Sequence, residues 1–256
     1  MWSGKEEKSG MDMNRLVTVI TPCYNSEKTI RRTIESVLNQ TYENIEYLII
    51  DGASKDKTVE IAKSYEEAFG GRMKIFSEPD EGIYYAMNKG IGLATGELIG
   101  IVNSDDYYEQ EAVEHIVGES SDKPYQILYG FERILNEGQE TQIVIHHHTN
   151  LPNQMITHPT CFVTKKLYED KGVFNTNYRY SADYEFMLRM FQDKQVEFKP
   201  VYQLISNYAL GGASGTGDAY LETMGLHCKY GVISKKKYNM LKMKLKLSKM
   251  LGRFLR

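Results

Sequence analysis

The first half of the chain alternates short apolar runs with segments whose apolar residues recur at helical spacing, and this alternation constrains the fold most. The runs are rich in β-branched residues, which is typical of strands. The predicted strands are Leu16–Thr21, Ile45–Ile50, Met73–Ser77 and a fourth that begins at Leu98. Helices are predicted between them at 30–38, 55–69 and 83–94. This order predicts an α/β fold with a mainly parallel central sheet flanked by helices.

Polar side chains follow all four predicted strands at the points where the strands end. In doubly wound sheets, ligands collect beyond the carboxyl ends of parallel strands. We therefore expect one binding site assembled from distant segments. The residues concerned are Tyr24 with Asn25, Asp51, Asp80, and Asp105 with Asp106.

The predicted strand that begins at Leu98 is followed by Asn103-Ser104 and then by two adjacent acids, Asp105 and Asp106. Two adjacent ionised carboxylates repel each other unless a cation binds them. Ligands that offer only oxygen atoms suit Mg²⁺ or Mn²⁺ better than zinc. For the pair taken alone, a polar turn after a strand is the competing interpretation.

The second half is less regular. Strand-like segments are predicted at 126–131, 142–146, 161–164 and 196–206, with a hairpin turn at 136–138. Asp183 opens an apolar helical segment, where its charge either favours the helix dipole or serves chemistry. Residues 211–217 are predicted to form a mobile loop that folds over a site. His146–His148 favour a solvated strand end over a metal site.

Composition excludes several classes of protein. No apolar run reaches the roughly 20 residues of a membrane-spanning helix, and the N-terminus has no secretion signal, so we expect a cytoplasmic protein. Residues 1–14 are polar and aperiodic and are predicted to be a disordered leader. Cys23, Cys161 and Cys228 have no Cys-x-x-Cys spacing, which argues against a zinc site or a disulfide framework.

The net charge of −3 hides an uneven distribution. Residues 223–256 contain 10 Lys or Arg and no Asp or Glu, whereas the preceding residues contain 21 basic and 34 acidic residues. A basic tail on an acidic body indicates an anionic partner. Nucleic acid is disfavoured because the body is acidic and the tail lacks interleaved aromatic residues.

The tail is predicted to form an amphipathic helix from Lys235 onward, with one apolar stripe among lysines. Helices of this kind lie on anionic membrane surfaces. A solvated helix, or one that joins two copies in a homodimer, is the alternative. The predicted stripe consists of Met240, Met243, Leu247, Met250 and Phe254.

Four segments occur in a fixed order over the first half of the chain. They are Val17–Glu27, Ser36–Tyr42, the Asp51-Gly52-Ala53-Ser54-x-Asp56-x-Thr58 stretch, and Asn103–Asp106. Together they resemble the inverting glycosyltransferases of family 2, whose nucleotide-diphospho-sugar transferase fold is called GT-A. The resemblance covers about residues 15–210. We therefore predict a GT-A domain over 15–222 and a basic C-terminal helical tail over 223–256.

The resemblance implies a donor site. Residues that would hold the base and ribose, line the donor pocket or approach the diphosphate are Thr21, Pro22, Tyr24, Asn25, Glu27, Asp51, Gly82, Asn88, Lys89 and Asp105. Family members often carry Asp-Asp-Gly-Ser where this chain has Asp51-Gly52-Ala53-Ser54, so the second carboxylate is missing here.

The resemblance also implies a metal and a base. Asp105 and especially Asp106 match the acids of the Asp-x-Asp motif that bind Mn²⁺ or Mg²⁺, with Asn103 in place of the first acid. Asp183 matches the catalytic base that accepts the proton of the attacking hydroxyl, although Ala182 replaces the usual Glu. His158 would contact the diphosphate or the acceptor, or would cap structure before Pro159.

The resulting hypothesis is a metal-dependent, inverting transfer of one sugar from a nucleotide-sugar donor, a UDP-sugar, to a saccharide acceptor. The tail would hold the enzyme on the inner face of the cytoplasmic membrane, where lipid-linked acceptors of cell-surface polysaccharides, O-antigen among them, are found. Two rivals remain. A sugar nucleotidyltransferase should carry a Gly-rich, basic loop after the first strand, which Thr21–Asn25 lacks. A non-catalytic, membrane-associated relative would bind no donor.

Overall fold

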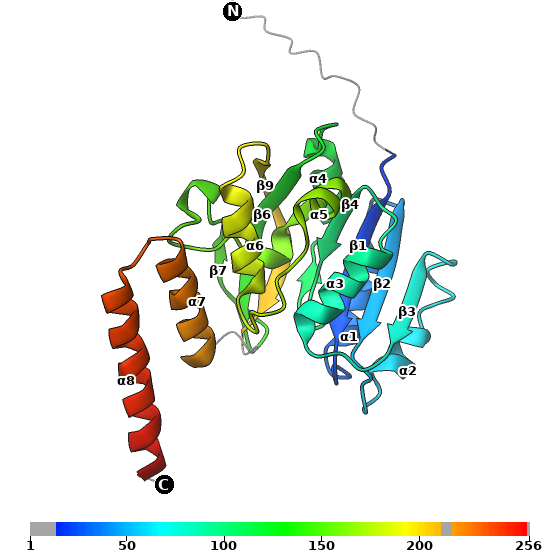
Figure 1. Ribbon diagram of the computed structural model, residues 1–256. Helices are drawn as coiled ribbons and strands as arrows, with labels where there is room; N and C mark the ends of the chain where they lie inside the picture. The colour runs from blue at the N-terminus through cyan, green and yellow to red at the C-terminus, as the bar shows by residue number, and fades with distance from the viewer. Residues whose placement is uncertain (1–13, 211–216, 255–256) are drawn as a thin grey trace, which may run out of the picture.

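The computed structural model describes residues 14–210 and 217–254, with side chains described up to residue 247. Within these residues the chain forms one nine-stranded sheet in the order β3-β2-β1-β4-β8-β6-β9-β5, with β7 paired to β6 (Figure 1). The strands are β1 (Val17–Cys23), β2 (Ile45–Asp51), β3 (Met73–Ser77), β4 (Leu98–Ile101), β5 (Tyr107–Tyr108), β6 (Gln126–Asn136), β7 (Gln139–Val144), β8 (Phe162–Thr164) and β9 (Glu197–Ala209).

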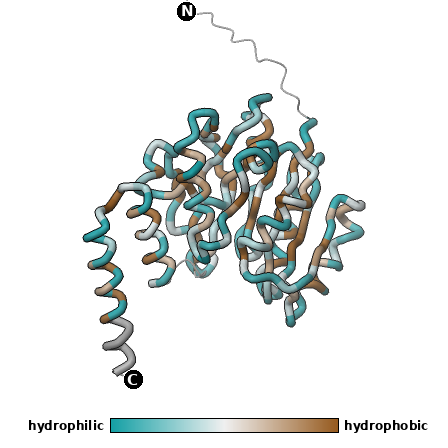
Figure 2. Tube along the Cα trace, viewed as in Figure 1, coloured by the Kyte–Doolittle hydropathy of each residue, from teal (hydrophilic) through white to brown (hydrophobic). Residues whose placement is uncertain are grey.

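Helices cover both faces of the sheet. One hydrophobic cluster joins the sheet to α3, α5 and α6, and a second joins the opposite face to α1, α2 and α4. Figure 2 shows hydrophobic residues concentrated along the central strands. The helices are α1 (Ile30–Leu38), α2 (Thr58–Lys63), α3 (Ile83–Leu93), α4 (Ala112–Glu119), α5 (Lys165–Lys171), α6 (Ala182–Phe191), α7 (Gly217–Lys229) and α8 (Lys235–Phe254).

The four N-terminal strands are parallel, as the alternation of strands and helices predicts. Successive residues of these strands pack against opposite faces of the sheet. Val19 packs in the cluster with α1, and its neighbour Ile20 packs in the cluster with α3. Covering both faces explains why the strands are continuously apolar instead of alternating with polar residues. The mainly parallel α/β fold is thus confirmed.

The predicted end of β1 at Thr21 is wrong, since the strand continues through Pro22 to Cys23. Pairing of β1 with β4 ends at Ile20, whose carbonyl accepts the last bond from Val102 N. Alternate residues of a strand face the same neighbour, so the missing N–H of Pro22 points to a side where no ladder bond is needed. The other side continues to pair with β2 as far as Asp51.

Helix α2 is shorter than predicted, because it ends at Lys63 and not near Phe69. After Lys63 the backbone bonds tighten to i→i−3, as in Tyr65 N to Ala62 O. The chain then turns so that Phe69 packs on Tyr47 of β2, with ring centroids 5.2 Å apart. Tertiary packing of one aromatic residue therefore overrides the helical pattern.

The second half of the sheet contains the two long strands β6 and β9, which run parallel. The predicted hairpin turn joins β6 to β7, where Glu137 and Gly138 adopt φ values of 49° and 81°. Two successive positive φ values are typical of the hairpin turn that matches strand twist. At Gly130 of β6 a Cβ would lie 2.7 Å from Gln203 O, so only glycine allows β9 to approach this closely.

The C-terminal region contains two helices that lie side by side (Figure 1). Leu226 of α7 is fully buried in the cluster with α6, and α8 packs on α7 through Tyr238 and Leu245. The boundary predicted between 222 and 223 falls inside α7. The predicted leader, apart from Asn14, and residues 211–216 of the loop predicted at 211–217 lie outside the described residues, whereas Gly217 is the first residue of α7. Among the described helices, none is long and apolar enough to cross a membrane.

Candidate active site

The loops that follow β1, β2 and β4 are joined to one another at the carboxyl edge of the sheet. Asn25 N donates to Ser54 Oγ at 2.8 Å, and Ser26 N donates to Thr58 Oγ1 at 2.7 Å. The Ser26 and Ser104 hydroxyls lie 2.7 Å apart. Three segments far apart in the sequence therefore form one rim, as the strand-end pattern predicts.

Side chains of the β1 loop hold the β2 loop in place. Asn25 Oδ1 accepts from Lys55 N at 2.8 Å, and Glu27 Oε2 accepts from Lys57 N at 3.1 Å. These predicted donor-site residues therefore shape the rim through their own hydrogen bonds. Tyr24, by contrast, is 60% exposed. An exposed aromatic ring on a rigid loop is available for stacking on a planar ligand.

The structure gives Asp51 and Thr21 a role in the frame of the site. Asp51 is 1% exposed, and its carboxylate accepts from Ser54 N at 3.0 Å and from Ser77 Oγ at 2.6 Å. Thr21 is fully buried, with its hydroxyl 3.0 Å from Tyr47 OH. Both side chains form hydrogen bonds within the protein, so they order the strand ends.

The adjacent acids Asp105 and Asp106 have opposite environments. Asp106 is fully buried, and its two oxygens accept from Ala209 N at 3.0 Å and from Asn103 Nδ2 at 3.1 Å. Asp105 is half-buried, and no hydrogen bond to its carboxylate occurs within the described part of the chain. Arg32 of α1 donates to the Asp105 carbonyl at 2.7 Å and fixes the turn.

Asp106 shares its buried environment with Glu132 of β6. Burial, and next the charge of Asp105, raise the pKa of Asp106 to about 7. Burial, and next the charge of Asp106, raise the pKa of Glu132 to about 8. The Glu132 carboxylate contacts Ser206 Oγ at 3.4 Å. Burial and mutual repulsion make ionising both acids costly, so the pair retains a proton near neutral pH.

The residues after β4 fit a divalent cation, though in a different way from the prediction. No cluster of three or more His, Cys, Asp or Glu side chains suited to a metal occurs among the described residues. The Asn103 Oδ1 atom is buried without a hydrogen-bond partner in the described structure. An Asp105 carboxylate and an amide oxygen are ligands that Mg²⁺ and Mn²⁺ accept, with phosphate oxygens and water completing the shell. Both oxygens of Asp106 are already occupied, so Asp105 fits the metal better.

Asp183 lies in the first turn of α6 with its carboxylate held by two donors. Tyr84 of α3 donates from its hydroxyl to Asp183 Oδ1 at 2.8 Å, and Tyr184 N donates to the same oxygen at 2.8 Å. Burial, and next the Asp183 charge, raise the pKa of Tyr84, so its hydroxyl stays protonated and donates. Asp183 itself is half-buried, and its Oδ2 accepts no hydrogen bond from the part of the chain that the structure describes.

His158 lies near this carboxylate. Its ring packs edge-on against Phe174 with centroids 5.6 Å apart, and the residue is 8% exposed. Burial lowers the pKa of His158, while the Asp183 charge opposes that change. The lowered pKa of His158 favours the neutral imidazole at pH 7.

Helix α7 organises the loop that leads into α6. The Glu222 carboxylate accepts three successive backbone N–H groups, from Arg179 at 3.0 Å and from Tyr180 and Ser181 at 2.7 Å each. Ser181 immediately precedes α6 and its catalytic candidate Asp183. No sequence signal marked Glu222, because an acid that accepts N–H groups some 40 residues away leaves no local pattern.

The remaining predicted donor-pocket residues have mixed roles. Asn88 Nδ2 donates to Phe174 O at 2.9 Å, and Asn88 Oδ1 accepts from Phe174 N at 3.1 Å. Lys89 forms an ion pair with Glu78 at 2.7 Å. Gly82 precedes α3 with φ 139°, a conformation open to glycine. Asn88 and Lys89 thus tie α3 to its surroundings, and Gly82 sets the entry to the helix.

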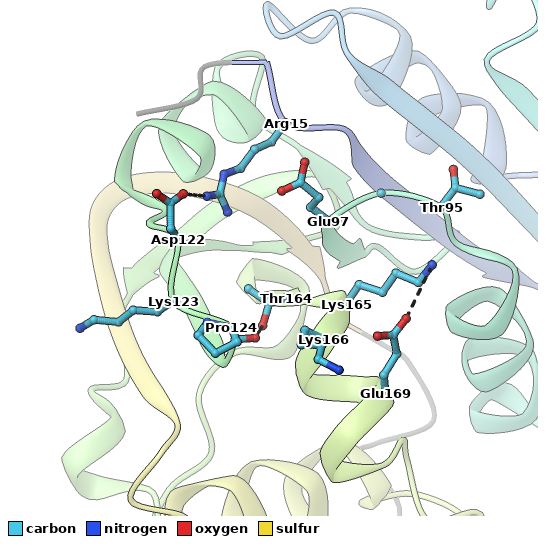
Figure 3. A pocket seen from close by; sticks show the side chains of 11 residues that line it. Arg15, Thr95, Glu97, Asp122, Lys123, Pro124, Thr164, Lys165, Lys166 and Glu169 are labelled. Atoms are coloured by element: carbon cyan, nitrogen blue, oxygen red, sulfur yellow. Dashed lines mark hydrogen bonds and ion pairs between the residues drawn. The ribbon is translucent and has the colours of Figure 1, made fainter. Parts of the chain in front are cut away.

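A cavity of about 370 Å³ lies elsewhere, next to the residues that precede β1 and β4 (Figure 3). Arg15 and Asp122 form an ion pair at its wall, and Lys165 pairs with Glu169 at 3.9 Å. The side chains that line the cavity carry both positive and negative charges. The cavity lies at the amino ends of β1 and β4, whereas the rim lies at the carboxyl ends of the parallel strands. This cavity is therefore separate from the rim described above.

Sequence comparison identifies relatives over most of the chain. A model of the family described as Glycosyl transferase family 2 matches residues 18–194. The chain is 27% identical over 206 residues to the PGL/p-HBAD biosynthesis glycosyltransferase of Mycobacterium bovis, a match that covers 78% of this chain and 80% of the relative. The family match includes the strand-end loops and Asp183, and ends before α7.

Solved structures show the same fold. TarS 1-349 of S. aureus, in complex with UDP-GlcNAc, matches with a TM-score of 0.68 at 17% identity, over 88% of this chain and 70% of that one. The match to a longer TarS chain of S. aureus covers 42% of that chain. Mannosyltransferase PcManGT from Pyrobaculum calidifontis, in complex with GDP-Man and Mn²⁺, matches with a TM-score of 0.64 at 16% identity, over 86% of this chain and 64% of that one.

Proposed function

Because the chain belongs to glycosyltransferase family 2 and is a glycosyltransferase of the GT-A fold, we propose that it moves one sugar from a UDP-linked donor to a saccharide hydroxyl with inversion. The observation that carries this proposal is the placement of Asp183. Its Oδ1 is held by Tyr84 and by the backbone at the start of α6, while Oδ2 accepts no hydrogen bond among the described residues. A fixed, partly exposed carboxylate is what a general base requires.

The proposed reaction is a single displacement. The acceptor hydroxyl gives its proton to the open oxygen of Asp183 while its own oxygen forms a bond to the anomeric carbon. The bond from that carbon to the diphosphate breaks, and the electron pair leaves with the diphosphate. Attack from the opposite face inverts the centre, so an α-linked donor gives a β-linked product.

The donor is proposed to lie along the rim formed by the loops after β1, β2 and β4. Tyr24 would stack on the base, since its ring is exposed and its loop is fixed through Asn25 and Ser26. The UDP-GlcNAc complex of the matching S. aureus structure supports a uridine donor. Asp51 and Thr21 support this rim from beneath.

A divalent cation, Mn²⁺ or Mg²⁺, is proposed to bind at Asp105, with Asn103 Oδ1 as a second oxygen ligand. When bound, such an ion neutralises the negative charge that develops on the departing diphosphate. The Mn²⁺ complex of the matching mannosyltransferase supports this choice of ion. Arg32 contributes by holding the Asp105 backbone in place.

The acceptor is proposed to be carried by a lipid at an anionic membrane surface, on the inner face of the cytoplasmic membrane. Helix α8 packs on α7 through Tyr238 and Leu245, which leaves Met240, Met243 and Leu247 at 43%, 59% and 50% exposed. Six lysines lie between residues 235 and 246 on the same helix. Exposed apolar side chains among lysines are suited to the headgroup region of a membrane.

The experiment that tests this function is a screen of UDP-sugars for release of UDP, with Mn²⁺ and a panel of saccharide acceptors. We expect Asp183→Asn to lower transfer by at least about 100-fold, since it removes the base. UDP affinity should stay nearly unchanged, because Asp183 does not touch the nucleotide in this proposal.

Asp105→Asn serves as the comparison variant, because it should weaken Mn²⁺-dependent UDP binding as well as transfer. Asp106→Asn should affect metal binding less than Asp105→Asn does. Full activity of the Asp183 variant would remove this residue from the mechanism. Release of pyrophosphate instead of UDP would support a nucleotidyltransferase, and UDP binding without transfer from any donor would support a non-catalytic relative.

A further inference from the structure

The carboxylate of Asp80 lies directly over Gly52. A Cβ atom added to Gly52 would lie 2.8 Å from Asp80 Oδ2 and 3.3 Å from Asp80 Cγ. A side chain at residue 52 would therefore have to displace the Asp80 carboxylate, which ends an exposed side chain. The absence of a side chain at residue 52 and the position of the Asp80 carboxylate therefore fit each other.

The backbone around Asp80 fixes this arrangement. Strand β3 pairs with β2 up to the level of Asp51 and Ser77, and Glu78 N donates to Asp51 O at 3.0 Å. The chain then turns, and Gly82 N donates to Asp80 Oδ1 at 2.9 Å. One oxygen of the carboxylate is thus held by the backbone, while Oδ2 is the oxygen that faces Gly52.

Asp80 belongs to the same rim as the loops after β1 and β2. Its charge acts on the thiol of Cys23 together with those of Asp51 and Asp56, and burial combined with these charges raises the pKa of Cys23. The residue after Cys23 is Tyr24, which is exposed on the β1 loop. An exposed aromatic ring and a carboxylate oxygen are therefore presented at the ends of β1 and β3, the two strands that flank β2.

We propose that Asp80 is the residue that recognises the donor base, by accepting a hydrogen bond from a ring N–H at Oδ2. An ionised carboxylate only accepts hydrogen bonds. Uracil and guanine present a ring N–H on the edge opposite the sugar, whereas cytosine and adenine present a ring nitrogen lone pair there. Asp80 therefore selects uracil over cytosine. This inference rests on the proposed function, because the base is that of the nucleotide-sugar donor.

The structure suggests a variant that reverses the preference. In Asp80→Asn, the Gly82 N–H still requires an acceptor, so the amide oxygen takes the place of Oδ1 and the NH₂ group takes the place of Oδ2. The base then meets a hydrogen-bond donor, the NH₂ group, where the wild type presents the acceptor Oδ2. The NH₂ group repels the N3–H of uracil and matches the N3 lone pair of cytosine.

The test is calorimetric binding of UDP and CDP to the full chain with Mn²⁺. We expect the wild type to prefer UDP by at least about tenfold, the usual effect of one hydrogen bond to a charged group. Asp80→Asn should lose about tenfold in UDP affinity and gain in CDP affinity relative to the wild type. Glu81→Gln removes the same charge from the neighbouring exposed residue and should leave the ratio unchanged.

A second variant separates recognition from folding. Asp80→Gly combined with Gly52→Asp returns a carboxylate to this space from the β2 side and should restore much of the preference for UDP. An unchanged ratio of UDP to CDP affinity in Asp80→Asn, or a wild type that prefers CDP, would overturn the assignment of Asp80. A wild type that binds no nucleoside diphosphate with Mn²⁺ would instead overturn the proposed function, and this inference with it.

Discussion

At the scale of single residues, the pair Asp105 and Asp106 shows how far sequence reasoning reaches. Adjacent acids after a strand predict a cation site, but the sequence does not say which of the two acids faces inward. The N–H of Ala209 on β9 decides this, because it captures the Asp106 carboxylate. That contact spans 103 residues, and no local pattern contains it.

Buried Glu132 leads to a prediction about stability. Its pKa is raised from 4.5 to about 8, first by burial and then by Asp106. The folded state therefore binds a proton that the unfolded state releases, and this contribution to stability is complete below about pH 4.5 and is lost as the pH rises to about 8. We expect Glu132→Gln, which is neutral at every pH, to lose much of this pH dependence.

The measurement is urea denaturation at pH 5 and pH 8.5 in EDTA. The unfolding equilibrium constant of the wild type should rise by about tenfold or more between these values, and that of Glu132→Gln clearly less. Glu137→Gln, at the exposed turn of the same hairpin, serves as the control and should behave like the wild type. Parallel pH dependences of the wild type and the Glu132 variant would contradict this account.

At the scale of elements, strands and helices that follow a strong apolar pattern were predictable. Strand β3 and helix α1 have the predicted ends, and α3 differs from its prediction by one residue. Helix α2 departs from its pattern because Phe69 packs on Tyr47, and β1 passes through Pro22 because no ladder bond is needed there. In both cases a partner from another element decides the outcome, which local spacing does not encode.

Helix α7 is the element that sequence reasoning did not identify as part of the site. The Glu222 carboxylate accepts hydrogen bonds from the backbone N–H groups of Arg179, Tyr180 and Ser181. The last of these residues precedes Asp183 by two positions. His227, on the same helix, lies 3.0 Å from the Tyr184 hydroxyl through Nε2. The helix thus holds the start of α6 from two sides.

We predict that Glu222→Ala lowers transfer by about tenfold or more while UDP affinity stays unchanged. The variant leaves three backbone donors without their acceptor, so the loop before α6 should lose its fixed geometry and Asp183 its position. Hydrogen exchange of the amides at 179–181 should become faster. Glu222→Gln keeps one acceptor oxygen and should recover part of the rate.

The exposed Tyr220 of the same helix provides a control, since Tyr220→Ala should leave both transfer and amide exchange unchanged. If Glu222→Ala accelerated exchange without slowing transfer, the loop would be shown to be irrelevant to the position of Asp183. If it reduced UDP affinity and rate together, a general loss of folding would be the better explanation.

At the scale of the whole molecule, the charge is divided between an acidic body and a basic C-terminal helix. The sequence predicted this division and the helix, and the structure adds which side of α8 is covered. Tyr238 and Leu245 face α7, whereas Met240, Met243 and Leu247 remain exposed among lysines. The hydrophobic side chains of α8 therefore serve two purposes, one inside the protein and one toward a partner.

The last prediction uses this division of α8. Truncation after Gly231 should strongly reduce cosedimentation with vesicles of anionic lipid, because it removes the lysines together with the exposed stripe. Binding of the wild type should weaken with added salt and be slight on neutral vesicles, since each basic residue near an anionic surface contributes about 1 kcal/mol. Met243→Gln combined with Leu247→Gln alters only exposed positions, so it should weaken vesicle binding without disturbing the packing of Leu245 on α7. Unchanged sedimentation of the truncated chain would exclude the membrane contact, and a fall in molecular mass of the double variant in solution would show that the stripe joins two copies instead.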